Sequence, residues 1–229
     1  MEILWNDVCM EDGPFPLGTD SFACAWFAHF PKGSKICDLG CGSGAISLML
    51  LADDPSANVT GIELMPQAAA IAKENAEHNR LPFTVLQADL RNISQLLPAG
   101  SMDCVISNPP YFAVNSGFTA KGLLAQARSE ETCTLTQLCN AAKWLLKTSG
   151  RFVLVHRPER LADLIFSLRN ADLEPKRIRF VRHRQDQPVS LVLLEARKGG
   201  RPGLSYEPDL VFYDADGETD EYRRMYHRE

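Results

Sequence analysis

The chain has 229 residues, a formal net charge of −5, 45% hydrophobic residues and 23% charged residues. This composition is typical of a soluble globular domain, and it excludes collagen, coiled coil and wholesale disorder. No apolar run reaches the roughly 18–20 residues that cross a bilayer, and the first residues lack a secretory signal, so we expect a cytoplasmic protein without a membrane partner. Seven cysteines without a Cys-x-x-Cys pair predict reduced, mostly buried thiols and no metal site.

Apolar runs and helical patterns alternate along the chain. Helices are expected at 21–30, 45–52, 67–80, 135–146 and 160–170, and strands at 34–39, 58–63, 83–87, 102–107 and 150–156. Two further strands, 175–184 and 189–197, are expected to pair in antiparallel fashion. This alternation predicts an α/β fold: a Rossmann-like, seven-stranded, mostly parallel sheet with helices on both faces and an antiparallel final strand. We expect an N-terminal segment over 1–33, one domain over 34–200, and a loosely attached acidic tail over 201–229.

Charge is distributed unevenly. Residues 176–201 contain eight lysines and arginines against two acids, whereas the tail from Glu207 onward contains eight acids against three basic residues. The basic segment is either a solvated face or a binding surface for a polyanion, because such segments raise affinity for phosphate.

Three glycines follow the first predicted strand of the sheet, in Asp38-Leu-Gly40-Cys-Gly42-Ser-Gly44. Glycine allows positive φ and close approach of a ligand, and the helix behind the turn presents unpaired N–H groups. Glu63 ends the next strand, where a carboxylate can accept both hydroxyls of a ribose. Asp89 ends the third, where it can accept from an adenine amino group, while the Leu90 amide meets a ring nitrogen.

The fourth strand ends in Asn108-Pro109-Pro110-Tyr111. The prolines alone predict a rigid turn. Beyond that, the amide oxygen of Asn108 and the carbonyl of Pro109 can accept both N–H groups of a planar amine, and Tyr111 offers a stacking face. This chemistry favours N-methylation of a conjugated NH2 group, with adenine N6 as the leading case and a glutamine amide among the others.

A base in a stacked nucleic acid has to flip out to reach such a pocket. The loop 112–128 is expected to close over this pocket. Pro110 and Tyr111 are expected to contact the flipped nucleobase, and three polar side chains of the loop are further expected substrate contacts: Asn115, Lys121 and Arg128. The alternative for Arg128 is an ion pair with Glu130 or Glu131 at a helix start.

Together these motifs resemble the class I S-adenosylmethionine-dependent methyltransferases. The resemblance implies S-adenosylmethionine as the cofactor, and the Gly-x-Gly-x-x-Gly spacing of a nicotinamide dinucleotide site is absent. The implied cofactor-binding residues are Asp38, Gly40, Gly42, Gly44, Glu63, Leu64, Asp89, Leu90 and Asn108.

The N-terminal stretch Pro16-Leu-Gly-Thr19-Asp20-Ser, placed before these motifs, resembles the bacterial tRNA1(Val) adenine-N6 methyltransferase family over roughly residues 1–200. The resemblance implies methylation of an adenosine beside the anticodon, with Thr19 and Asp20 near the methionyl end of the cofactor. It also favours a tRNA-facing role for the basic segment, with Arg179, Arg182 and Arg184 as contacts. No obligate protein partner is expected.

Two alternatives stay open at this point. A glutamine methyltransferase of the release-factor type shares the Asn-Pro-Pro-Tyr chemistry, although such enzymes usually carry a helical domain before the core, and only 33 residues precede Ser34 here. A catalytically silent RNA-binding module on the same fold would have no need for Asn108 and Tyr111.

Overall fold

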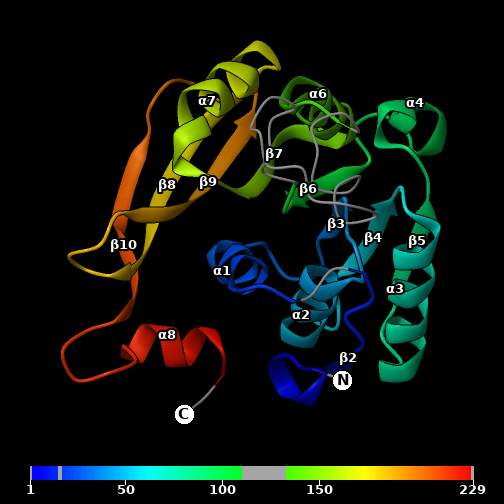
Figure 1. Cartoon of the computed structure of the whole chain (residues 1–229). Helices are drawn as coiled ribbons and strands as arrows, with labels where there is room; N and C mark the ends of the chain where they lie inside the picture. Colours follow the sequence, from blue (N-terminus) through cyan, green and yellow to red (C-terminus); the bar gives the residue numbers. More distant parts are fainter. Residues whose placement is uncertain (1, 15–16, 110–132, 228–229) are drawn as a thin grey trace.

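A computed structural model describes residues 2–14, 17–109 and 133–227. Its main feature is an eight-stranded sheet with the order β10-β8-β9-β7-β6-β3-β4-β5 (Figure 1). The strands are β3 (Lys35–Leu39), β4 (Asn58–Glu63), β5 (Phe83–Gln87), β6 (Met102–Ser107), β7 (Leu146–His156), β8 (Leu173–Arg184), β9 (Val189–Lys198) and β10 (Ser205–Tyr213). Neighbouring strands are parallel except at β9, which runs antiparallel to both β7 and β8. The predicted α/β fold class and the antiparallel pairing of β8 with β9 are thus confirmed. The sheet has eight strands and not the predicted seven, and the antiparallel strand is not the last one, because β10 follows it and pairs in parallel with β8.

Helices cover both faces of the sheet. One apolar cluster joins the sheet to α1 (Thr19–Phe27), α2 (Ala45–Asp53), α3 (Pro66–Asn79) and α8 (Asp220–Met225). A second cluster joins the other face to α4 (Ile93–Leu96), α6 (Leu135–Leu145) and α7 (Leu161–Asn170). The remaining elements are short: β1 (Glu2–Ile3), β2 (Cys9–Met10), η1 (Trp5–Asp7), η2 (Leu90–Asn92) and η3 (Pro158–Arg160).

The two-sided core explains why the strands read as almost continuous apolar runs. Along β7, Phe152 and Leu154 enter one cluster while Val153 and Val155 enter the other, and all four are fully buried. Successive side chains of a strand point to opposite faces, so a sheet covered on both sides needs apolar residues at every position. Five of the seven cysteines are buried as well, as predicted.

The C-terminal segment differs from the loosely attached tail that the sequence predicts. Residues 205–213 form β10, an eighth strand that pairs in parallel with β8. After it, α8 packs beneath the sheet, where Met225 is fully buried and its carbonyl accepts from Trp5 Nε1 at 2.7 Å. The segment is therefore part of the folded unit.

Helix α1 also begins earlier than predicted, at Thr19, with Gly18 as its N-cap residue. None of the helices within the described ranges is both long enough and apolar enough to span a bilayer.

Candidate active site

The glycine turn lies where β3 ends and α2 begins. Gly40 and Gly44 have positive φ values of 76° and 92°, which side-chain-bearing residues adopt only with strain. A Cβ at Gly44 would come within 2.8 Å of the Phe83 ring, so packing requires glycine there. A Cβ at Gly40 would meet no atom of the described residues within 4 Å, so this side of the turn is open to a ligand.

Glu63, at the end of β4, is locked to the turn by main-chain amides. Its Oε1 accepts from Met65 N at 2.7 Å and its Oε2 from Gly42 N at 2.8 Å. Burial raises the pKa of this carboxyl, while the two amide donors partly oppose the rise. A carboxylate oxygen can accept more than one hydrogen bond, so the group is held in place with capacity left for ribose hydroxyls.

Asp38, in β3, is buried and only half satisfied. Its Oδ2 accepts from Ser47 Oγ at 2.8 Å, whereas its Oδ1 has no hydrogen-bond partner in the described part of the chain. Burial raises the pKa of this carboxyl to about 7, with a further rise from nearby Glu63. An orphaned carboxylate oxygen next to a glycine turn fits a ligand that carries an ammonium group or another donor.

An apolar pocket opens between the ends of β3 and β6. Its lining includes Leu39, Gly40, Leu90, Ser107, Pro109 and residues from the start of α6. Such a lining suits a flat heteroaromatic ring. Leu90 lines this pocket, and its contact with the cofactor stays a prediction.

The carboxylate of Asp89 is occupied by its own neighbour. Its Oδ1 accepts from Arg91 N at 2.9 Å, and Arg91 Nε donates to both oxygens, at 3.0 and 2.8 Å. The guanidinium lowers the pKa of Asp89. Its contact to an adenine amine stays a prediction, and it would have to share the carboxylate with Arg91. Leu64 follows Glu63 directly and is exposed.

Asn108 follows β6 and meets α1. Its Nδ2 donates to Ser21 Oγ at 3.1 Å, and Ser107 Oγ donates to Leu39 O at 2.7 Å, which ties the ends of β6 and β3 together. Thr19 Oγ1, at the start of the same helix, accepts from Tyr226 OH at 3.1 Å, while Asp20 Oδ1 accepts from Ser21 N at 2.9 Å. The structure therefore brings α1, the glycine turn and Asn108 together at the carboxyl ends of the central strands β3 and β6.

Two residues of this site, Ser21 and Tyr226, are not among those that the sequence motifs predict. Ser21 stands in the Thr-Asp-Ser stretch that carries the family resemblance, so the signal for it was present. Tyr226 lies 207 positions from its partner Thr19, in the segment that the sequence predicts to be a loosely attached tail, and no local pattern points to it. Pro110, Tyr111, Asn115, Lys121 and Arg128 lie outside the described residues.

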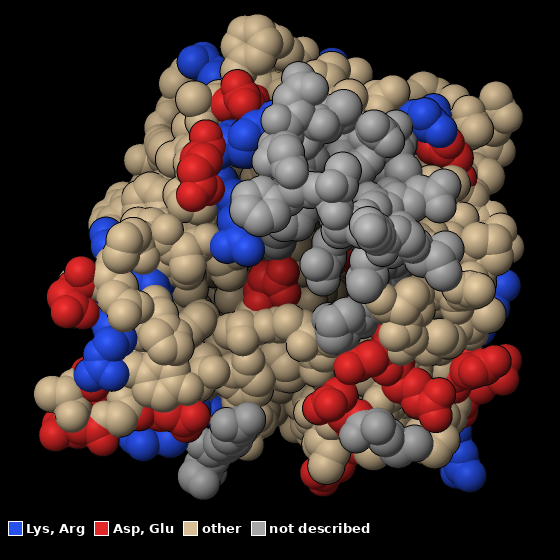
Figure 2. Space-filling view, viewed as in Figure 1, with Lys and Arg blue, Asp and Glu red and all other residues tan. Residues whose placement is uncertain are grey.

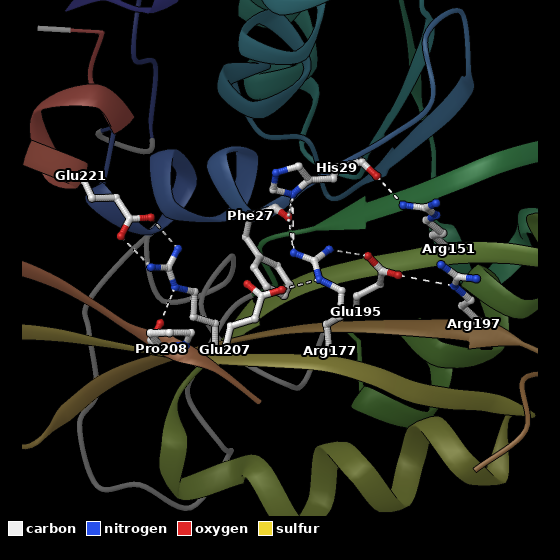
Figure 3. Close-up of polar contacts among 10 residues, drawn as sticks. Phe27, His29, Arg151, Arg177, Glu195, Arg197, Glu207, Pro208 and Glu221 are labelled. Carbon is white, nitrogen blue, oxygen red and sulfur yellow. Dashed lines mark hydrogen bonds and ion pairs between the residues drawn. The ribbon is translucent and has the colours of Figure 1, made fainter. Parts of the chain in front are cut away.

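The predicted RNA-binding arginines of β8 turn towards the C-terminal segment. Arg179 makes two parallel hydrogen bonds to Glu221, at 2.7 and 2.6 Å, and Arg182 pairs with Asp209 at 2.6 Å. Arg177, in the same strand, contacts both Glu195 and Glu207 (Figure 3). Arg184 Nη2 donates to the main-chain oxygen of Asp214 at 2.5 Å. On the side where β8, β10 and α8 lie, basic and acidic side chains are interspersed (Figure 2).

The features of this site fit S-adenosylmethionine, which carries ribose hydroxyls, an ammonium group and an adenine ring. The glycine turn is open to a ligand, the buried glutamate suits the ribose, the aspartate with one unpartnered oxygen suits the ammonium group, and the apolar pocket suits the adenine. With the sheet order and the antiparallel β9, these features define a class I S-adenosylmethionine-dependent methyltransferase.

Comparison with known proteins supports the assignment to this class of methyltransferase. The methyltransferase small domain family matches residues 18–167. Proteins named tRNA1(Val) (adenine(37)-N6)-methyltransferase are similar to this chain: one from Porphyromonas gingivalis is 35% identical over 65% of the chain and 61% of its own length. One from Parabacteroides distasonis is 30% identical over 84% of the chain and 79% of its own length. The chain therefore belongs to the methyltransferase small domain family, and to the branch whose members carry that tRNA methyltransferase name.

A solved structure shows the same fold. The crystal structure of a predicted O-methyltransferase from Agrobacterium tumefaciens superposes with a TM-score of 0.75, at 22% identity, over 91% of this chain and 96% of that one.

Proposed function

We propose that this enzyme transfers the methyl group of S-adenosylmethionine to the exocyclic N6 of an adenine in tRNA. The observation that carries the proposal is the placement of Asn108 and Pro109 directly after β6, next to the strand end from which the glycine turn starts, with Pro109 in the lining of the apolar pocket. The relatives' names specify adenine 37 of tRNA1(Val), and we take this nucleotide as the proposed target.

Asn108 and Pro109 would handle a nucleophile that is weak by nature. The lone pair of an exocyclic amine is delocalised into its ring, and the nitrogen carries two N–H donors. The amide oxygen of Asn108 and the carbonyl of Pro109 accept these two donors and turn the lone pair away from the ring plane. S-adenosylmethionine, when bound, supplies an electrophilic methyl group on a sulfonium sulfur. The amine loses its proton after the transfer, so no general base with a tuned pKa is needed.

The other proposed roles follow from the site. Glu63 holds the ribose, Asp38 the amino-acid end, and Leu90 lines the adenine pocket; Thr19 and Asp20 complete the site from α1. Tyr111 is proposed to stack on the target base, with Pro110 beside it and Asn115, Lys121 and Arg128 as further substrate contacts. A tRNA substrate agrees with the cytoplasmic location that the sequence predicts. The glutamine-methylating alternative is not favoured, because the relatives are named for tRNA adenine.

Labelling experiments test the proposal directly. The protein is incubated with labelled S-adenosylmethionine and separate pools of tRNA, ribosomal RNA and release factors, and the labelled pool is digested to identify the modified unit. We expect N6-methyladenosine from the tRNA pool. Label in a release-factor glutamine, or in no pool, would refute the proposal.

Replacing Asn108 tests the mechanism. Asn108→Ala removes one of the two oriented acceptors, so we expect turnover to fall by about 10²-fold or more while cofactor affinity stays near normal. Asn170→Ala, at the exposed end of α7, is the matched control and should keep wild-type turnover. Retained turnover in Asn108→Ala would remove this residue from the reaction.

A further inference from the structure

The first turns of α1 contact two consecutive residues where β6 ends. Ser21 and Cys24 are three positions apart and so lie on the same face of the helix. Cys24 Sγ donates to Ser107 O at 3.8 Å, and Ser21 Oγ accepts from Asn108 Nδ2 at 3.1 Å. Two residues on one face of α1 therefore contact the two residues that directly precede Pro109.

Helix α1 is held firmly on its other sides. Cys24 is fully buried, and the Phe22 ring lies 4.2 Å from the Tyr226 ring, measured between centroids. Near the end of the helix, Trp26 Nε1 donates to Glu221 at 3.2 Å. The Ser21 hydroxyl therefore projects from an element with little freedom to move.

The amide of Asn108 needs an imposed orientation because its two ends are nearly equal in shape and opposite in chemistry. The oxygen accepts hydrogen bonds and the nitrogen only donates them. If the group rotated by half a turn, its NH2 end would face the N–H donors of the target amine and repel them. With Nδ2 bound to the Ser21 hydroxyl, the carbonyl oxygen is the end of the amide that does not face this hydroxyl.

We propose that Ser21 is a positioning residue for methyl transfer, whose hydroxyl holds the donor end of the Asn108 amide and so aims its oxygen at the target amine. The inference rests on the proposed function for the identity of that amine. Ser21 itself does not need to touch the substrate or the cofactor.

Turnover of Ser21 variants provides the first test. Ser21→Ala removes the acceptor for Nδ2, so a fraction of amides adopts the wrong orientation. We expect kcat to fall about 3- to 10-fold, as for loss of one net hydrogen bond, with an unchanged Kd for S-adenosylmethionine and an unchanged Tm. Ser21→Thr keeps a hydroxyl at this position and should restore most of kcat. Ser56→Ala removes an exposed serine hydroxyl from the opposite edge of the sheet and should match wild type.

A double-mutant cycle separates this role from a merely structural one. If Ser21 acts through Asn108, then Ser21→Ala should cause no further loss of kcat in an Asn108→Ala background. Independent, additive losses would overturn the proposal, as would a Ser21→Ala enzyme with wild-type kcat.

NMR of the Asn108 side-chain amide tests the role of Ser21 without a measurement of methyl transfer. The side-chain NH2 signals of Asn108, identified by their absence in Asn108→Ala, should shift and exchange faster with water in Ser21→Ala but not in Ser56→Ala. If wild-type protein methylates no adenine in tRNA, the proposed function fails, and these signals still decide whether Ser21 holds the amide. Unchanged signals would overturn the proposal.

Discussion

Each oxygen of the Glu63 carboxylate accepts a hydrogen bond from a main-chain amide. Replacing either oxygen by an NH2 group should therefore disturb the site. Glu63→Gln replaces one oxygen by an NH2 group that faces Met65 N or Gly42 N, donor against donor. We expect the affinity for S-adenosylmethionine, measured by calorimetry, to fall about 5- to 100-fold, because a disturbed acceptor serves both the turn and the ribose. Glu74→Gln, on the exposed side of α3, is the control; equal affinities in the two variants would contradict this role.

Asp38 makes stability depend on pH. Its pKa rises from an ordinary 3.8 to about 7 on burial, so between these values the folded state holds one more proton than the unfolded state. The free energy of unfolding of the cofactor-free protein should therefore fall as pH rises through this window. Asp38→Asn removes the titration, so its stability relative to wild type should be greater at pH 8 than at pH 5.

Thermal unfolding of both proteins at the two pH values gives the measurement. Asp54→Asn serves as a control, since hydrogen bonds from Ser56 and Gly33 lower the pKa of Asp54 and keep it ionised throughout pH 5–8. Its effect should be equal at both pH values. A difference between Asp38→Asn and wild type that does not change with pH would show that Asp38 does not titrate in this range.

At the scale of single residues, the sequence could predict those functional groups that stand at strand ends. Glu63 and Asn108 each end a predicted strand, and strand ends of a parallel sheet meet at one edge. Ser21 and Tyr226 act through contacts that span 87 and 207 positions, and no local pattern encodes such contacts. The contact of Tyr226 follows only from packing, whereas Ser21 stands in the stretch that carries the family resemblance and only its partner is hidden from the sequence.

At the scale of elements, α8 and β8 are joined through Glu221. This carboxylate accepts two hydrogen bonds from Arg179 and one from Trp26, and Arg179 is largely buried. Glu221→Ala leaves the guanidinium and the indole N–H without that partner, so we expect unfolding to require about 1–3 kcal/mol less free energy, measured by urea denaturation.

The neighbouring residue offers a matched control. Asp220 also begins α8 and pairs with Arg223, but its side chain is 82% exposed. Exposed pairs contribute little, so Asp220→Ala should cost under about 1 kcal/mol. Equal losses in the two variants would show that the Glu221 contacts do not stabilise the attachment of α8.

The elements that the sequence missed are those with weak local signals. In β10, Pro208 and two acidic residues interrupt the apolar alternation, although Leu210 and Phe212 are buried in the expected strand period. An edge strand tolerates such interruptions because one of its sides makes no ladder hydrogen bonds. Helix α8 has only 6 residues, too few for helical periodicity to stand out, and its start is marked only by Thr219, whose hydroxyl accepts from Tyr222 N.

At the scale of the whole molecule, three arginines of the basic segment pair with acids of the C-terminal segment: Arg177 with Glu207, Arg179 with Glu221, and Arg182 with Asp209. Residue counts along the sequence show the basic segment and the acidic segment. The ion pairs between them depend on the parallel register of β10 and β8, which places Glu207 and Asp209 near arginines. Arg179 and Arg182 are thus engaged within the protein. Their contacts to tRNA stay a prediction that would require them to leave these partners or to share them.

Arg184 is placed differently. It is exposed at the end of β8, a strand that runs in the same direction as β6, and it donates to a neutral acceptor, the main-chain oxygen of Asp214. A cation in this position keeps its charge available for a phosphate of a bound tRNA. Each phosphate contact contributes about 0.7–0.9 to the slope of log K against log salt concentration.

We therefore expect Arg184→Ala to reduce the salt slope of tRNA binding by about 0.7–0.9 without loss of stability. Arg182→Ala should lower the Tm, because it removes the guanidinium that pairs with the carboxylate of Asp209, whose side chain is only 12% exposed. If Arg182 stays paired with Asp209 when tRNA binds, this variant leaves the slope unchanged. Binding curves at four or more salt concentrations, with Tm measured in parallel, separate the two effects. A slope that falls equally in both variants would mean that the arginines of β8 exchange the acidic C-terminal segment for the RNA backbone when tRNA binds.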